Sequence, residues 1–195
     1  MIVKETQNQV CYYEPGPSFS PRSFAAHLGS LIEDVKQTED KGGVLFLCIG
    51  SDRSTGDSLG PIIGYKLERQ LASDCRVVGT LSRPVHAVNL EETVEEIQRR
   101  YPEHVIVAID ASIGRPEQVG TISLGRGGIR PGLGVRKRLA RVGDIFITGV
   151  VGNGRCREPM MLQSIRLGAV MELADAICSG IKSVESFWEF RDRNC

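Results

Sequence analysis

The chain has 195 residues, and its 24 Lys and Arg balance its 24 Asp and Glu, so the net charge is zero when histidine is neutral. Hydrophobic residues make up 41% and charged residues 25%, an ordinary globular composition that excludes a disordered chain, a coiled coil and a fibrous repeat. Because there is no cationic excess, we expect neither a dedicated nucleic-acid binder nor a membrane-surface binder.

Two further features of the sequence indicate the compartment. No apolar run reaches the roughly 18 residues that a bilayer-spanning helix needs, and the N-terminus lacks the pattern of a secretory signal. The cysteines show neither a C-x-x-C pair nor a regular framework; they stand at positions 11, 48, 75, 156, 178 and 195. We therefore expect a reduced, cytoplasmic protein with no membrane partner.

The chain divides into two parts at residue 20. Residues 1–19 have no strong periodicity and contain Pro15-Gly16-Pro17, which predicts a loosely structured arm. Residues 20–195 show no repeat and no linker, so we expect a single α/β domain. Ser20-Pro21 has the N-cap and first-turn residues of a helix, which we expect to end near Thr38.

Apolar runs and helical patterns then alternate along the chain. The runs at 44–49 and 105–109 are apolar throughout, which is typical of strands covered on both faces. Further strands are expected at 77–81, 119–124 and 145–151, and further helices at 61–71, from Asn89 onward, and from Glu158 to about Ser179 with Gly180 as the C-cap. This alternation predicts a three-layer α/β/α sandwich with a mostly parallel sheet.

Two aspartates follow the central strands. Asp57 lies eight residues beyond the run 44–49, just before a predicted helix, and Asp110 ends the run 105–109. If the two strands are neighbours, the carboxylates converge at the sheet edge where open α/β folds bind ligands. Close carboxylates share a proton, so one can activate water while the other donates, or the two can ligate a divalent metal. On spacing alone, a helix cap and a turn remain the alternatives.

Three separated segments resemble a known protein family. Residues 50–61 (GSDRSTGDSLGP), 107–111 (VAIDA) and 129–135 (IRPGLGV) are similar, in this order, to segments of the germination protease of spore-forming bacteria. Nearly the whole chain resembles the YyaC family of sporulation proteins, which is similar to the catalytic core of that protease. The resemblance implies a phosphorylase/hydrolase-like fold of the hydrogenase-maturation peptidase type, with Asp57 and Asp110 as the catalytic aspartates.

The resemblance also bears on metal binding. Hydrogenase-maturation peptidases bind metal at the acidic positions with the help of a later histidine. This chain has only His27, His86 and His104, and none of them follows Asp110. We therefore expect a carboxylate dyad that uses neither a metal nor another cofactor.

Asp52 and His86 are further candidates near the dyad. Asp52 lies in the same loop as Asp57, where it either tunes the dyad or binds substrate, or is a surface aspartate. His86 follows the strand predicted at 77–81 and should lie on the same sheet edge. Its ordinary pKa of about 6.5 suits a proton relay, with a structural loop histidine as the alternative.

The stretch 125–138 has the most unusual composition in the chain, with five glycines and five cations in fourteen residues. Such a stretch suits a mobile lid that attracts an acidic or extended substrate, and Arg130, Arg136 and Arg138 are then candidate substrate contacts. A plain solvated loop is the alternative.

The dyad candidates come from the residues and the protease class comes from the resemblance; together they predict a sporulation-associated, aspartic-type endopeptidase that acts on a small protein or peptide. By the resemblance, the substrates include small acid-soluble spore proteins and the location is the forespore. The alternative is a catalytically silent member of the same fold that binds a peptide or protein partner during sporulation. A homo-oligomer is left open.

Overall fold

The computed structural model describes residues 10–71, 75–131, 141–154 and 164–192, the last eight of them as backbone. The helices are α1 (Pro21–Glu39), α2 (Leu59–Leu67), α3 (Leu90–Arg100) and α4 (Leu167–Asp192), with the short 3₁₀ helices η1 (Gly56–Ser58) and η2 (Pro116–Gln118). The strands are β1 (Cys11–Tyr13), β2 (Val44–Cys48), β3 (Cys75–Val78), β4 (Val105–Gly114), β5 (Ile122–Arg126) and β6 (Ile145–Asn153).

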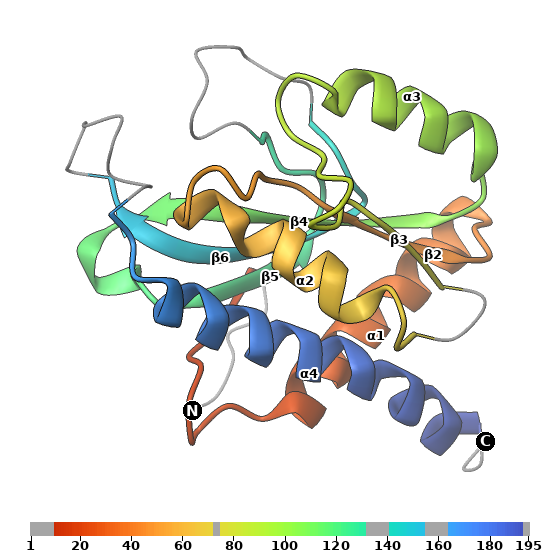
Figure 1. Cartoon of the computed structure of the whole chain (residues 1–195). Helices are drawn as coiled ribbons and strands as arrows, with labels where there is room; N and C mark the ends of the chain where they lie inside the picture. The colour runs from red at the N-terminus through yellow and green to blue at the C-terminus, as the bar shows by residue number, and fades with distance from the viewer. Residues whose placement is uncertain (1–9, 72–74, 132–140, 155–163, 193–195) are drawn as a thin grey trace.

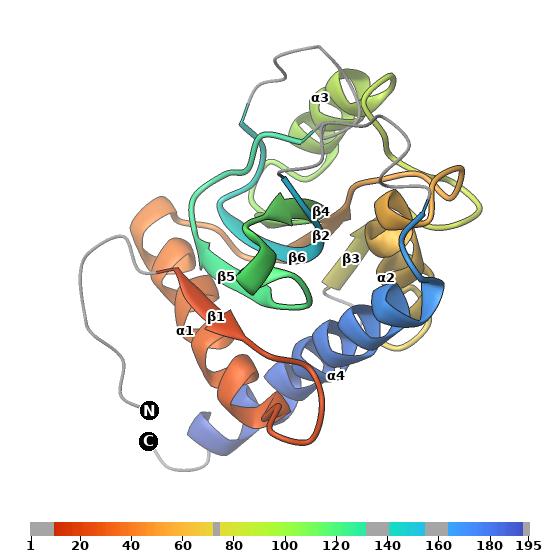
Figure 2. The same ribbon diagram turned by 90° about the vertical axis from the view of Figure 1, so that its left-hand side faces the viewer.

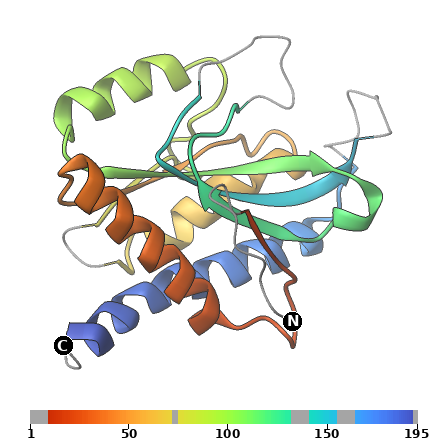
Figure 3. The same ribbon diagram turned by 180° about the vertical axis from the view of Figure 1, so that it is seen from behind.

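The six strands form one sheet in the order β1-β5-β6-β4-β2-β3. β3, β2, β4 and β6 run parallel, whereas β5 and β1 pair antiparallel at one edge. Figures 1 and 3 show α3 over one face of the sheet and α1, α2 and α4 over the other. The predicted three-layer α/β/α sandwich with a mostly parallel sheet is confirmed.

Side-chain alternation along β4 decides what faces each helical layer. Val107 and Ile109 are fully buried in the larger core, under α1, α2 and α4. Ala108 is buried in the smaller core with Leu90 and Ile97 of α3. Since side chains alternate along a strand, Asp110 lies on the α3 face of the sheet.

The stretch predicted as a loosely structured arm contains β1, which pairs with β5 at the sheet edge (Figure 2). Tyr13 anchors this strand, because its ring contacts Phe24 with centroids 5.0 Å apart and its hydroxyl lies 3.0 Å from Nδ1 of His27. A three-residue strand is too short to show periodicity, so only these contacts with α1 reveal it.

The C-terminal helix also differs from its prediction. It begins at Leu167, and the expected start at Glu158 lies outside the described residues. It continues through Gly180, the expected C-cap, to Asp192. A Cβ atom at Gly180 would lie 2.3 Å from Cδ1 of Phe24, so this glycine permits close contact between α4 and α1 and does not end the helix.

Within the ranges that the structure describes, no helix combines the length and the apolar character needed to cross a membrane.

Candidate active site

The loop after β2 brings Asp57 to the sheet. Gly50 has φ +141°, and a Cβ atom there would lie 2.0 Å from the carbonyl oxygen of Asp57, so only glycine allows this approach. The Ser51 amide donates to the same carbonyl at 3.1 Å. At Gly60 a Cβ atom would lie 2.1 Å from the carbonyl oxygen of Ile49. Two glycines therefore hold η1 and the start of α2 against the end of β2.

The segment after β3 joins the same corner of the sheet. Ile49 forms a parallel bridge with Val85, and the Gly50 amide donates to the Val85 carbonyl at 2.7 Å. His86 follows directly, so the end of β2 positions both the Asp57 loop and the His86 loop. These contacts join segments more than 30 residues apart in sequence.

Asn89 holds His86 in one arrangement. It occupies the N-cap position of α3 but its side chain makes no capping bond. Its Oδ1 accepts from the His86 amide at 2.8 Å, and its Nδ2 donates to the Pro84 carbonyl at 3.1 Å. The Val88 amide donates to Nδ1 of His86 at 3.3 Å. A neutral His86 that accepts at Nδ1 carries its proton on Nε2.

Asp110 lies inside a strand and not at its end, which corrects the prediction. β4 continues to Gly114 because it remains paired with β6 beyond the end of β2. β2 and β4 are neighbours, as the converging-carboxylate hypothesis required. Asp110 therefore projects from a fixed strand at the position where its neighbour β2 has turned away into the Asp57 loop.

A pocket of about 290 Å³ brings the candidate groups together. Asp57, Asp110 and His86 all line it. Its other walls come from the loop after β2, the residues after His86 and Pro131: Ile49, Gly50, Ser51, Arg53, Ala87, Val88 and Pro131. The pocket lies at the carboxyl edge of parallel strands, the place where this class of sheet binds ligands.

The two carboxyl groups hold their protons more strongly than ordinary aspartates. Asp110 is 6% exposed, and burial, followed by the nearby charge of Asp57, raises its pKa well above the usual value. Burial also raises the pKa of Asp57, but the Ser51 amide and His86 favour its ionised form and oppose this effect. Asp57 is therefore the more acidic member of the pair.

Two buried thiols of the larger core are unsuited to nucleophilic catalysis. Cys48 and Cys178 are buried and unpaired. Burial raises the pKa of Cys178 to about 12 and raises that of Cys48 as well, so neither forms the reactive thiolate near neutral pH.

The described side chains around Asp57 and Asp110 do not form a recognisable metal site. Over the ranges that the structure describes, no group of three or more His, Cys, Asp or Glu side chains is placed to hold a metal ion. His27 bonds with Tyr13, and His104 lines a different pocket beside Lys41. Among the described residues, Asp57 and Asp110 are therefore not part of a three-residue group of potential metal ligands.

Of the remaining residues predicted from the sequence, the two that the structure describes do not line the pocket. Asp52 is exposed and does not line the pocket. Arg130 is exposed beside Pro131, which does line it. Arg136 and Arg138 lie outside the described residues, so their role stays a prediction.

Arg53 and Asn89 are the residues that sequence reasoning missed. Arg53 lines the pocket, and its place in the Asp57 loop was the available signal. Asn89 was predicted only as the start of a helix, and nothing in the local sequence indicates that its side chain bonds backward to the His86 loop.

The chain is similar to known proteins in both fold and sequence. The crystal structure of the NiFe hydrogenase maturation protease HycI from Thermococcus kodakarensis is similar in fold, with a TM-score of 0.55 and 16% identity, over 79% of this chain and 97% of that one. YyaC of Bacillus subtilis, an uncharacterized protein, is 42% identical over 138 residues, which are 71% of this chain and 67% of that protein. Residues 21–180 match the family described as "Protein of unknown function (DUF1256)". The chain belongs to the DUF1256 family and is a relative of YyaC.

Proposed function

We propose that this protein is an aspartic-type endopeptidase that cleaves a small protein or peptide with Asp57 and Asp110. The observation that carries the proposal is the shared pocket, in which two carboxyl groups with raised pKa values lie on neighbouring segments. Two such groups that differ in acidity divide the roles of base and acid between them.

Asp57 is the base and Asp110 the acid in this mechanism. Asp57 is the more acidic group because the Ser51 amide and His86 favour its charged form. Asp110 keeps its proton because it is buried and lies near the Asp57 charge. The Nε2–H of His86, fixed by the bond that Nδ1 accepts, is available to support the ionised Asp57.

Hydrolysis then proceeds in two steps. Asp57 removes a proton from water while the water oxygen bonds to the peptide carbonyl carbon, and Asp110 donates its proton to the carbonyl oxygen. The C–N bond breaks as the proton held by Asp57 passes to the leaving nitrogen. Asp110 recovers its proton from the new carboxyl group, so both aspartates return to their starting states.

The biological setting is proposed from relatives. The similar fold of a protein named as a maturation protease supports a peptidase. A role in the forespore is proposed only from the sequence resemblance to sporulation proteins, since the relative YyaC is itself uncharacterized. Small acid-soluble spore proteins are the substrates that this resemblance favours.

The test measures cleavage of two probes, purified small acid-soluble spore proteins and a pool of synthetic decapeptides. Asp57→Asn and Asp110→Asn are each expected to lower the cleavage rate at least 100-fold, because general acid–base catalysis contributes about 10²–10⁴. Asp52→Asn is the matched control, since Asp52 is exposed outside the pocket.

Two outcomes contradict the proposal. Wild-type rates in folded Asp57→Asn would exclude the dyad. Binding of the probes without cleavage by the wild-type protein would favour the silent, partner-binding alternative.

A further inference from the structure

A row of polar side chains crosses the sheet beside the dyad pocket. Asp110 of β4 pairs with Thr148 of β6, and Thr148 in turn pairs with Ser123 of β5. Paired residues on neighbouring strands direct their side chains to the same face of a sheet. We call these three residues the polar row. The proposed mechanism uses only its first member, Asp110.

The strands alternate around the polar row, which fixes the face on which it lies. Ile147, next to Thr148, is fully buried in the larger core under α1, α2 and α4. Leu124, next to Ser123, is fully buried in the same core. Because side chains alternate along a strand, Thr148 and Ser123 lie on the α3 face, where Asp110 also lies.

The two hydroxyl groups of the row bond to one another. Oγ1 of Thr148 lies 2.5 Å from Oγ of Ser123, a short O–H···O bond in which either hydroxyl can be the donor. Ser123 is only 7% exposed, so this bond gives its buried hydroxyl the partner that it needs. The Thr148 hydroxyl is therefore turned toward β5 and not toward β4.

Asp110 needs no further donor while it holds its proton. Burial and the nearby charge of Asp57 raise its pKa, and the Ala111 amide donates to its carboxyl group. In the proposed mechanism, however, Asp110 gives its proton to the substrate and becomes a buried carboxylate. Such a carboxylate is costly unless hydrogen bonds stabilise its charge, and Thr148 carries the neighbouring hydroxyl in the row.

A rotation of the Thr148 side chain brings its hydroxyl to that carboxylate. Neighbouring strands lie about 4.8 Å apart, and Asp110 and Thr148 are directly paired on one face. Side chains in strands commonly occupy more than one staggered χ1 position, and a change between two of them turns Oγ1 by about 120°. The Thr148 hydroxyl thus has a partner on each side, Ser123 on β5 and Asp110 on β4.

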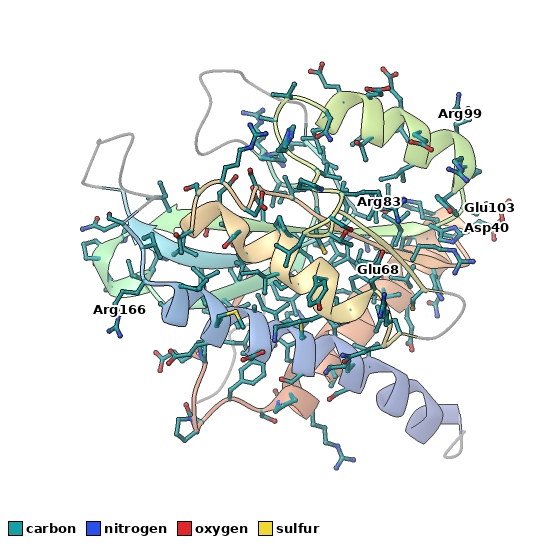
Figure 4. All side chains as sticks on the ribbon, viewed as in Figure 1. Asp40, Glu68, Arg83, Arg99, Glu103 and Arg166 are labelled. Carbon is teal, nitrogen blue, oxygen red and sulfur yellow. The ribbon has the colours of Figure 1, made fainter. Side chains whose placement is uncertain are left out.

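Several charged or titratable groups also act on Asp110. Those that line the dyad pocket or adjoin its wall are Asp57, Arg53, His86 and Arg130. Asp40 and Glu103 lie at the opposite end of the parallel strands (Figure 4). The hydroxyl groups of the polar row carry no charge, so substitutions of Thr148 or Ser123 change the hydrogen bonding of Asp110 without changing the charges around it.

We propose that the Thr148 hydroxyl is a positioning group with two partners: it bonds Ser123 while Asp110 holds its proton, and it turns to the Asp110 carboxylate once that proton has left. In the cleavage step the proton of Asp110 goes to the substrate carbonyl oxygen, and Thr148 keeps its own proton and only donates a hydrogen bond. The role in cleavage rests on the proposed function, whereas the response to ionisation of Asp110 does not.

The test is a titration of the Asp110 carboxyl group by carbon-13 NMR, on the whole protein without substrate, between pH 4 and pH 9. Asp110→Asn assigns the signal. Thr148→Val removes the hydroxyl and keeps the branched shape, so it is expected to raise the pKa of Asp110 by about one pH unit, the usual effect of losing one hydrogen bond to a charged group. Ser123→Ala removes the competing partner and is expected to lower that pKa.

Two controls separate hydrogen bonding from a structural effect. Thr121→Val is the matched control, because the Thr121 hydroxyl donates to the Gln118 carbonyl at 2.7 Å and lies outside the polar row. It is expected to leave the pKa of Asp110 unchanged. Thr148→Ser keeps a hydroxyl and is expected to retain the wild-type pKa. If Thr148→Val does not fold, Thr148→Ala replaces it.

The rotation itself is measured in the wild-type protein. Three-bond NMR couplings report χ1 of Thr148, and they are expected to change with the same midpoint as the titration of Asp110. Constant couplings across that titration overturn the proposal. An unchanged pKa of Asp110 in Thr148→Val overturns it too, and so do shifts of the same sign in Thr148→Val and Ser123→Ala.

These outcomes are independent of the proposed function, because no substrate is present. The polar row can fail while the dyad stands, and the titrations still decide the proposal if the wild-type protein cleaves no peptide. For a decapeptide that the wild-type protein cleaves, Thr148→Val is expected to lower kcat about tenfold with little change in KM, since the hydroxyl bonds a carboxylate that forms only during the reaction. An unchanged kcat overturns the role of Thr148 in cleavage.

Discussion

Asp110 occupies a position where an ionised group is costly. Burial and the nearby Asp57 raise its pKa, so the folded protein retains a proton that the unfolded chain releases near pH 4. Above that pH the unfolded state binds fewer protons than the folded state, and the free energy of unfolding falls as pH rises toward the raised pKa of Asp110. The candidate acid therefore lowers stability at neutral pH.

Asp110→Asn is expected to raise the free energy of unfolding, since the amide has nearly the same shape and carries no charge. The gain over wild type should be small near pH 4 and should grow as pH rises through the raised pKa of Asp110. Urea unfolding between pH 4 and pH 8 measures it, with the exposed Asp52→Asn as control. A difference that does not vary with pH would show that ionisation of Asp110 is not its cause.

Asn89 acts at the same scale, as a positioning residue for His86. Asn89→Ala removes two hydrogen bonds, to the His86 amide and the Pro84 carbonyl. At about 1 kcal/mol per bond, we expect kcat/KM to fall roughly five- to thirtyfold. The readout is a double-mutant cycle, in which Asn89→Ala has no further effect on kcat/KM once His86 is alanine. Additive losses would mean that Asn89 acts independently of His86.

At the scale of the elements, the packing of α1 against α4 depends on one close contact. Phe24 of α1 is fully buried, and its ring lies where a Cβ atom at Gly180 of α4 would stand. Helix propensity favours alanine over glycine by about 1 kcal/mol, but the ring has no space to move. Steric exclusion should therefore outweigh propensity at this position.

Gly180→Ala is expected to destabilise the protein by about 1–3 kcal/mol, the usual cost of overpacking. Gly168→Ala, on the same helix and with no atom within 4 Å of the added Cβ, is expected to stabilise it by up to about 1 kcal/mol. Urea unfolding of both variants measures these changes in the free energy of unfolding. If Gly180→Ala were as stable as Gly168→Ala, the α1–α4 contact would be looser than described.

At the scale of the whole molecule, the sheet order creates the site. β2 and β4 are central neighbours, and β4 extends past the end of β2. The space left by the shorter strand is filled by the Asp57 and His86 loops, which form the pocket walls. Asp57 and Asp110 thus line one pocket although they are 53 positions apart in the sequence.

From this arrangement we also predict that removing metal ions does not affect cleavage. The dyad has no grouped third ligand among the residues that the structure describes, so chelation should not affect the reaction. Cleavage of the decapeptide pool should keep its wild-type rate, within twofold, after dialysis against EDTA. Complete loss on chelation, restored by a divalent ion, would point to the metal-dependent chemistry of the maturation peptidases.

Much of the fold is predictable from the sequence because its signals are local. The apolar runs that become β2 and the first half of β4, and the Ser20-Pro21 start of α1, follow from hydrophobic patterning and capping. The sequence also placed Asp57 after a central strand, whereas its prediction that Asp110 ends the neighbouring strand was wrong, because β4 continues to Gly114. These features depend on residues close together in the chain, which a periodic pattern records.

The tertiary structure decided what depends on distant residues. β1 exists because Tyr13 packs on α1, and α4 continues through Gly180 because Phe24 requires that glycine. The backward bonds of Asn89 and the edge position of β3 depend equally on which segments become neighbours. Sequence alone predicted that the two carboxyl groups converge beside central strands. Packing between segments distant in the chain determines their burial, and burial raises their pKa values.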